Sequence, residues 1–217
     1  MFLKQNYYLV DNGPIKPFYN MMRLHKPPEY KDYHHIAGCD HAGTGAIAGP
    51  IVGAAVILPN GFYNETLYNT KKLATALPIH LYNLIQQHAV SWSIAMVDHE
   101  EINKYGIPNA SQLAIHNALN QLKILPSLLL VAGRSFDGYK AIPHQCIPQG
   151  DKIYAAITAA NILAKIYRDR YMEKLDKDFP AYGWKKNKGY ATPAHKQVIK
   201  QFGRTLYHRK SFDWKEN

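Results

Sequence analysis

The sequence predicts an α/β fold with a central sheet flanked by helices and a helical C-terminal part. Short apolar runs of strand length alternate with longer segments of helical period, which is typical of this class. Hydrophobic residues make up 47% of the 217 residues, enough to form a core. We therefore expect one domain over residues 35–217, preceded by an irregular leader over residues 1–34.

Four apolar segments are the predicted strands. The second of them is a nearly continuous apolar run between Pro50 and Pro59, as expected for a strand buried on both faces. The first ends in an acid, Asp40. The predicted strands are residues 35–40, 51–58, 89–97 and 128–132.

Two long helices and a shorter last one are predicted between and after these strands. Asn109 is a plausible N-cap for the first. Behind it an apolar face repeats at helical spacing, formed by Ile115, Ala118, Leu119 and Leu122. The second long helix is expected over residues 154–176, and the last begins near Pro193.

The leader combines tyrosines with prolines and shows no sustained period. Because proline interrupts a helix, we expect a loosely packed, irregular extension. The alternative is an arm that contacts nucleic acid, since aromatic rings stack on bases.

Charge and composition narrow the classes of partner and location. The net charge is +10 and the pI is near 9.4, which favours a polyanionic partner, with nucleic acid first. No apolar run reaches the ~20 residues of a membrane span, so no membrane is expected as a partner. Two cysteines do not make a disulfide scaffold, and a cytoplasmic location is expected. An organelle matrix is weakly supported, because Arg23 is the only arginine before residue 134.

The segment with the clearest chemistry follows the first strand: Gly38-Cys39-Asp40-His41-Ala42-Gly43-Thr44-Gly45. A carboxylate at a strand end is held rigidly, and glycines beside it let the backbone approach a ligand. On these residues alone the segment fits any anion-binding loop.

Six segments, taken in order, resemble the ribonuclease HII family. The glycine-rich segment resembles the family's opening Asp-Glu-Ala-Gly-Arg-Gly turn. The others are Asn69-Thr70-Lys71-Lys72-Leu73, Gln149-Gly150-Asp151, the long helix with Ala159-Ala160-Asn161-Ile162-Leu163-Ala164-Lys165 and Arg168-Asp169, Lys188-Gly189-Tyr190-Ala191-Thr192 with His195, and His208-Arg209-Lys210-Ser211-Phe212.

The resemblance implies a ribonuclease-H-like fold, a mixed central sheet flanked by helices. It also implies an endoribonuclease that cuts the RNA strand of RNA–DNA hybrids, or cuts at single ribonucleotides in duplex DNA. Four carboxylates would hold two divalent ions, Mg or Mn, that activate a water and stabilise the leaving oxygen. The expected state is a monomer.

Carried over by position, the first family aspartate is Asp40 and the fourth is Asp151. His41 stands where the family has glutamate, and Ala132 stands where it has the third aspartate. Alanine has no ligand atom, and imidazole prefers borderline ions to magnesium. We therefore expect weak metal binding by Asp40, Asp151 and the third candidate, His41. Asp137 is not expected to replace the missing acid, because five extended residues span ~16 Å.

The resemblance also implies contacts to nucleic acid. Gly43 and Gly45 would approach the ribose 2′-hydroxyl, and Tyr190 would pack against the sugar. Tyr190 also fits a ring packed in the core with its hydroxyl exposed to water. Thr44 stands where the family has an arginine. Asp169 is expected to hold neighbouring basic residues. The candidate phosphate contacts, each also readable as a solvated charge, are Lys71, Lys72, Lys165, Lys188 and Arg209.

Three hypotheses follow. The chain is a weak or metal-shifted ribonuclease, a binding module that grips RNA–DNA hybrid or structured RNA without cutting it, or a paralogue without a defined role. The loss of two anionic ligands favours the second, with active cleavage of RNA–DNA hybrids as the alternative.

Overall fold

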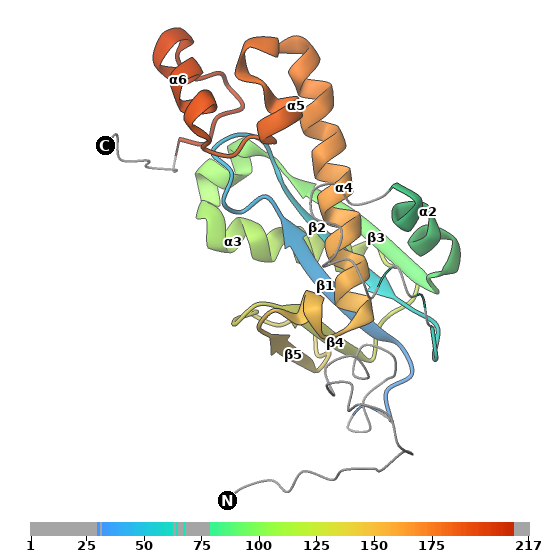
Figure 1. The fold of residues 1–217 in the computed structure, drawn as a ribbon. Helices are drawn as coiled ribbons and strands as arrows, with labels where there is room; N and C mark the ends of the chain where they lie inside the picture. Colours follow the sequence, from blue (N-terminus) through green and yellow to red (C-terminus); the bar gives the residue numbers. More distant parts are fainter. Residues whose placement is uncertain (1–29, 31, 63, 65–66, 68–78, 211–217) are drawn as a thin grey trace, which may run out of the picture.

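A computed structural model describes residues 30, 32–62, 64, 67 and 79–210 of the chain. Its centre is a five-stranded mixed sheet of order β3-β2-β1-β4-β5 (Figure 1). β1 runs antiparallel to β2 and parallel to β4; β2 and β3 are antiparallel, and β4 and β5 are parallel. The strands are β1 (Ile36–Ala42), β2 (Ile51–Ile57), β3 (Ser91–Val97), β4 (Leu128–Ala132) and β5 (His144–Ile147).

The four predicted strands are confirmed, and β4 has the predicted bounds. β2 is buried along its whole length, as its continuous apolar run predicted. β5 was not predicted from the sequence. It has four residues, two of them exposed, so its apolar pattern is too short to be distinctive.

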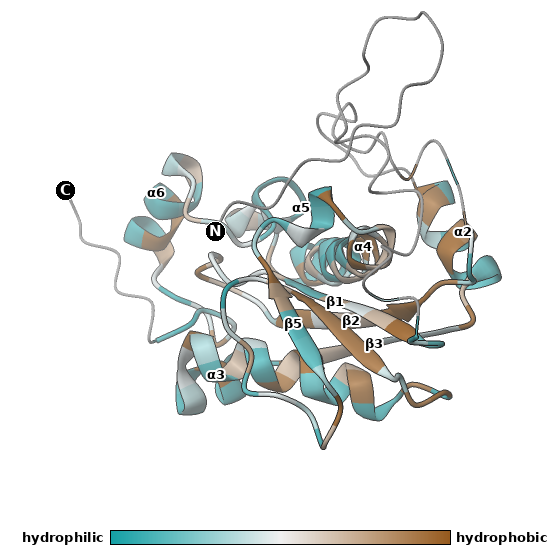
Figure 2. Cartoon of the chain, turned by 90° about the horizontal axis from the view of Figure 1, so that it is seen from below, coloured by the Kyte–Doolittle hydropathy of each residue, from teal (hydrophilic) through white to brown (hydrophobic). Residues whose placement is uncertain are grey.

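Helices cover both faces of the sheet. Figure 2 shows the sheet between α3 (His99–Asn120) and α4 (Ala155–Asp178). α2 (Ile79–His88) packs beside α4 on the same face, where Leu81 and Ile85 join the core formed with β2. No helix among the described residues is long and apolar enough to cross a membrane.

Two glycines allow the helices to approach the sheet closely. A Cβ on Gly38 of β1 would lie 2.1 Å from the Ala156 carbonyl carbon in α4. A Cβ on Gly53 of β2 would lie 2.4 Å from the same atom of Ala114 in α3. Because real Cβ contacts are never this short, any side chain at either position would push a helix off the sheet.

The predicted N-cap of the first long helix is wrong. α3 begins at His99, and the Asp98 side chain caps it by accepting from two backbone N–H groups, in a capping box with Glu101. Asn109 lies inside the helix. Gly106, with φ 76° and ψ 161°, is non-helical, so two helical segments meet at a kink there, and the second begins shortly before Asn109 with Pro108 in its first turn.

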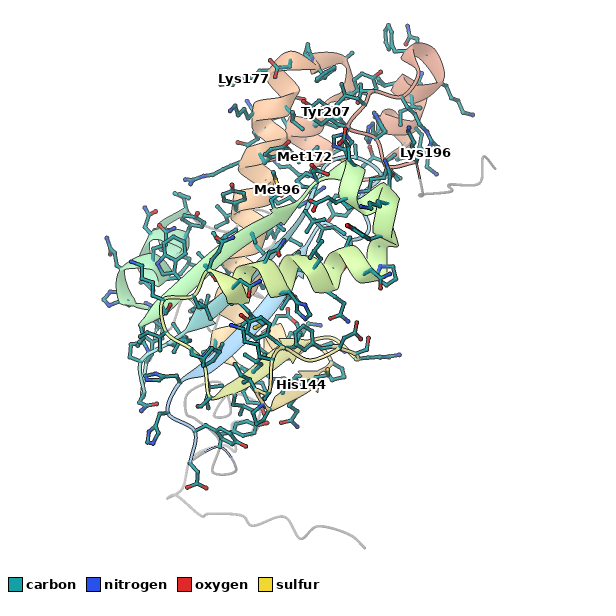
Figure 3. The ribbon with its side chains drawn as sticks, turned by 180° about the vertical axis from the view of Figure 1, so that it is seen from behind. Met96, His144, Met172, Lys177, Lys196 and Tyr207 are labelled. Atoms are coloured by element: carbon teal, nitrogen blue, oxygen red, sulfur yellow. The ribbon has the colours of Figure 1, made fainter. Side chains whose placement is uncertain are left out.

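The helical C-terminal part packs against the far end of α4. Met172 and Tyr207 mark this junction (Figure 3). α6 (Pro193–Phe202) begins at the predicted proline and is capped by the Thr192 side chain. The 3₁₀ turn Pro180–Tyr182 and the short α5 (Trp184–Asn187) complete this region, whereas the 3₁₀ turn Gly150–Lys152 lies between β5 and α4.

Most of the leader lies outside the described residues. Tyr30, one of the described leader residues, is buried against Leu128, Leu130 and Ile157, and its hydroxyl donates to the Gln145 side chain. The domain boundary at residue 34 stays a prediction, although this ring already belongs to the packed core.

Candidate functional site

The parallel strands bring the sequence-predicted acidic positions to one edge of the sheet. Cys39 and Val131 are the last paired positions of β1 and β4, and one residue further on each strand come Asp40 and Ala132. Asp151 lies in the 3₁₀ turn just after β5, where the Thr158 hydroxyl donates to its carbonyl oxygen at 2.6 Å. Ligand sites in open α/β sheets form outside such carboxyl ends of strands.

These residues line a cavity of about 400 Å³. Asp40 and Asp151 contribute carboxylates to it, and His41 and Ala132 contribute the positions where the family pattern has Glu and Asp. The structure therefore brings together all four positions that the sequence predicted as one site.

Asp40 is the most enclosed acid of the site, with 6% of its surface exposed. Its Oδ1 accepts the His41 backbone N–H at 2.7 Å, and its Oδ2 accepts the Asn161 amide at 2.9 Å. The pKa of Asp40 is raised to about 6, because burial and, to a smaller extent, the neighbouring Asp151 raise it more than His41 and the Asn161 amide lower it. The carboxylate is thus held by donors from the protein on both oxygens.

His41 does not restore the lost acid. Its Nδ1 lies 3.9 Å from Asp40 Oδ1, and the side chain is about one quarter exposed, 28%. Ala132 presents only a methyl group. Within the described part of the chain, no group of three or more His, Cys, Asp or Glu side chains is placed to hold one metal ion. Asp40 and Asp151 are the two carboxylates among the four positions that could hold a divalent ion.

Asp137 lies on the loop after β4, and its backbone N–H points to the Gln112 side chain at 3.5 Å. Its side chain is exposed and does not line the cavity. This agrees with the expectation that it does not replace the missing aspartate.

The glycine turn after β1 needs its first glycine. Gly43 has φ +96°, and a Cβ there would lie 2.1 Å from Arg168 Nε. Ala46 closes the turn by donating to the Gly43 carbonyl at 3.2 Å. Among the described residues the backbone N–H groups of Thr44 and Gly45 have no protein acceptor, so both are available to a ligand. Thr44 lines the cavity, and Gly45 faces the Tyr190 ring.

Two buried arginines support this turn from behind. Arg168 of α4 donates to the carbonyls of Pro50, Ala48 and Lys188. Arg209 donates to those of Gly49, Thr44 and Pro50. Each side chain is 1% exposed, and neither forms an ion pair with an acid in the described ranges.

Burial shifts the pKa of both guanidinium groups. It lowers the pKa of Arg209 to about 9, with the charge of Arg168 as the second cause, and it lowers the pKa of Arg168 as well. Two cations without buried counter-charges make this end of the cavity attractive to anions. Arg209 was predicted to contact phosphate; its burial excludes that contact, because the guanidinium is used on backbone carbonyls.

Tyr190 lies over one of these cations. Its ring centroid is 5.4 Å from Arg168 Cζ, and the residue is 43% exposed at the cavity wall. The alternative of a core ring is therefore wrong.

A hydrogen-bonded chain of buried rings holds the Tyr190 backbone. His195 Nδ1 lies 2.9 Å from the Tyr190 carbonyl oxygen, so this nitrogen carries the proton. His195 Nε2 then accepts from Trp184 Nε1 at 3.1 Å and from His208 Nε2 at 3.2 Å. His208 Nδ1 accepts the Thr205 N–H at 2.9 Å, which makes both tautomers consistent. Both histidines are neutral in this arrangement.

Burial agrees with that assignment. It lowers the pKa of His208 to about 4, with His195 as the second cause, and it lowers the pKa of His195. The family's Lys-Gly-Tyr and His-Arg segments thus meet through a neutral histidine pair.

The predicted lysine contacts differ in placement. Lys165 lines the cavity and pairs with Asp169 at 3.1 Å, so Asp169 holds a basic neighbour as expected. Lys188 pairs with Glu173 at 2.6 Å and is not among the cavity-lining residues. Lys71 and Lys72 lie outside the described residues.

Two residues of the site were not singled out from the sequence, Asn161 and Arg168. Both lie in the long helix whose pattern resembled the family, which is the signal that pointed to them. Their roles depend on which side of α4 faces Asp40 and the glycine turn, and the sequence alone does not give that orientation.

A mixed sheet with acids at its parallel strand ends, beside a glycine turn with free N–H groups, defines a ribonuclease-H-like protein. The sequence profile described as Ribonuclease HII matches residues 37–215. The chain belongs to the ribonuclease HII family.

Comparisons with individual relatives agree with this family assignment. Ribonuclease HII of Christiangramia forsetii is 49% identical over 177 residues, 82% of this chain and 89% of that protein. Ribonuclease HII of Porphyromonas gingivalis is 47% identical over 175 residues, 81% of this chain and 87% of that protein. The crystal structure of ribonuclease H2 from Pyrococcus horikoshii has a TM-score of 0.68 at 24% identity, covering 82% of this chain and 94% of that one, and supports the fold.

Proposed function

We propose that this chain binds RNA–DNA hybrid, or duplex containing a ribonucleotide, with impaired or absent cleavage. The observation that carries the proposal is the composition of one cavity: Asp40 and Asp151 are present, and His41 and Ala132 occupy the other two carboxylate positions.

The hydrogen-bond donors and the aromatic ring at the cavity support the proposed binding of nucleic acid. The bare N–H groups of Thr44 and Gly45 and the exposed ring of Tyr190 adjoin each other at the cavity. Buried Arg168 and Arg209 add positive charge behind them, and the whole chain carries +10. Phosphate attraction and a close backbone approach to a 2′-hydroxyl are what hybrid recognition needs.

The set of side chains at the four metal-ligand positions supports the proposed impairment or absence of cleavage. Two ions about 3.5–4 Å apart need several anionic ligands to offset their repulsion, and here two of four are gone. Removing one group that stabilises a transition state typically costs ~10²–10³ in rate. A member of the wider structural class, the ribonuclease HIII of a solved structure with TM-score 0.59, is described in complex with Mn²⁺. We propose Mg or Mn as the ion for this chain also, bound weakly.

The alternative is an active endoribonuclease that cleaves the RNA strand of hybrids with a divalent metal. It is favoured by the placement of Asp40 and Asp151 in one cavity. Monomeric state and cytoplasmic location stay predictions.

The test uses a labelled duplex carrying one ribonucleotide, first in magnesium and then in manganese. We expect wild-type protein to bind it without turnover, and a His41→Glu, Ala132→Asp double variant to gain cleavage. Turnover by the wild type at a rate similar to the double variant would contradict impaired cleavage. Failure of either protein to bind hybrid would contradict the binding role.

A further inference from the structure

A second cavity of about 220 Å³ opens beside the first, on the side of the strand ends that faces α3. His41, Ala132 and Gly133 line both cavities, so the two adjoin at the vacated carboxylate positions. Arg134 and Ser135, on the loop after β4, form the outer wall, and α3 forms the inner wall. Ala132 adds only a methyl group to the wall that the two cavities share.

The two cavities differ in charge. The first is lined by three carboxylates, Asp40, Asp151 and Asp169, and by two cations, Lys165 and Arg168. No carboxylate lines the second, whose charged lining residue is Arg134. Arg134 is exposed, and within the described ranges it forms no ion pair with an acid. Its guanidinium is therefore free to take an anion from solution.

Hydrogen-bond donors gather at the same place. Gly133 has φ +122°, and no atom lies within 4 Å of the position a Cβ would take, so space is open above this turn. In the part of the chain that the structure describes, the backbone N–H groups of Arg134 and Ser135 have no protein acceptor. Successive free N–H groups in a turn form an anion-binding concavity. The His41 ring, which lines both cavities, also has an N–H to donate.

We propose that this second cavity binds a phosphate group of the nucleic-acid strand directly, through Arg134 and His41, without a metal ion. The inference rests on the proposed function and names the contact that replaces the lost metal. In a two-metal site a cation lies between carboxylate and phosphate. Where the carboxylates are absent, a cationic side chain contacts phosphate itself, and arginine is suited to this by its planar pair of donors.

The test measures the affinity for a fluorescent RNA–DNA hybrid in EDTA and again in magnesium. Wild-type protein is expected to bind equally in both. Arg134→Gln should weaken binding roughly tenfold, the size of one charged hydrogen-bonded contact, and should lower the salt slope by about one unit. Arg134→Lys should recover part of the loss, because it keeps the charge.

The matched control is Lys177→Gln. Lys177 is an exposed cation near the end of α4, far from both cavities (Figure 3), and its loss should leave affinity unchanged. Thermal denaturation of each variant confirms folding, since Arg134 is exposed and packs no core.

A third variant restores the two carboxylates of the family pattern. His41→Glu with Ala132→Asp should bind hybrid poorly in EDTA and recover in magnesium, because the new carboxylates repel phosphate unless a cation lies between them.

Wild-type binding that needs magnesium, or an Arg134→Gln affinity equal to that of Lys177→Gln, overturns the inference and leaves the proposed function standing. Absence of hybrid binding in both buffers overturns the two together.

Discussion

Arg168 and Arg209 donate to the same atom, the carbonyl oxygen of Pro50, at 2.9 and 3.0 Å. One arginine comes from the long helix and the other from the C-terminal segment, so the shared acceptor joins both to the start of β2. The cost of two buried like charges is offset by six bonds to backbone carbonyls, which would otherwise be buried without donors.

Replacing either arginine should therefore lower the stability of the folded protein. We expect Arg168→Met to lower the free energy of unfolding by about 2–4 kcal/mol, because the carbonyls of Ala48 and Lys188 lose their donor while that of Pro50 keeps Arg209. Urea denaturation measures the change. Arg170→Met is the matched control, since Arg170 is exposed on the same helix and contacts the Tyr82 ring. A loss under 1 kcal/mol for Arg168→Met would contradict the supporting role.

Gly43→Ala should disturb the turn more than an alanine at another glycine of positive φ. At Gly43 the new methyl meets Arg168 Nε at 2.1 Å in addition to the backbone strain. Gly61 has φ +73° with no atom within 4 Å of the added Cβ, so Gly61→Ala isolates the strain, about 1 kcal/mol. We expect hybrid affinity and thermal stability to fall for Gly43→Ala, and only a small stability loss for Gly61→Ala. Equal effects would show that the contact with Arg168 is unimportant.

The neutral histidine pair should make stability depend on pH. The pKa of His208 is about 4 in the folded protein against 6.5 for an ordinary histidine, so the unfolded chain binds more protons between these values. Stability is therefore fully present above pH 6.5 and is lost as pH falls toward 4, by roughly 3 kcal/mol from this group.

Urea denaturation of His208→Gln at several pH values should show a flatter profile than wild type in that window. His80→Gln, at an exposed histidine of α2, should keep the wild-type profile. Parallel profiles for wild type and His208→Gln would contradict the neutral pair.

Asp40 should titrate near pH 6 when its side-chain carbon is followed by NMR. The Asn161 amide donates to the ionised form, so Asn161→Ala should raise this pKa further. A lowered pKa in that variant would contradict the hydrogen bond as a stabilising contact. Asn83→Ala, on α2 away from the site, serves as the control.

Much of the fold was predictable because it depends on local patterns. β2 and β4 are continuous apolar runs between turn residues, and α6 starts at a proline behind a capping threonine. The start of α3 was mispredicted because Asn109 follows a proline, and only packing decides whether the chain breaks or bends there. β5 escaped prediction because a four-residue edge strand takes its definition from its partner β4.

The sequence by itself determined the family resemblance and the residue types at the four positions that the family pattern gives to acids, because the chemistry of a side chain follows from its residue type. Only the tertiary structure decided which residues meet. It brought Asn161 to Asp40, turned Arg209 inward from a predicted surface contact, and opened a second cavity beside Ala132. The physical reason is that direction and burial arise from packing between distant segments, which no local pattern of residues encodes.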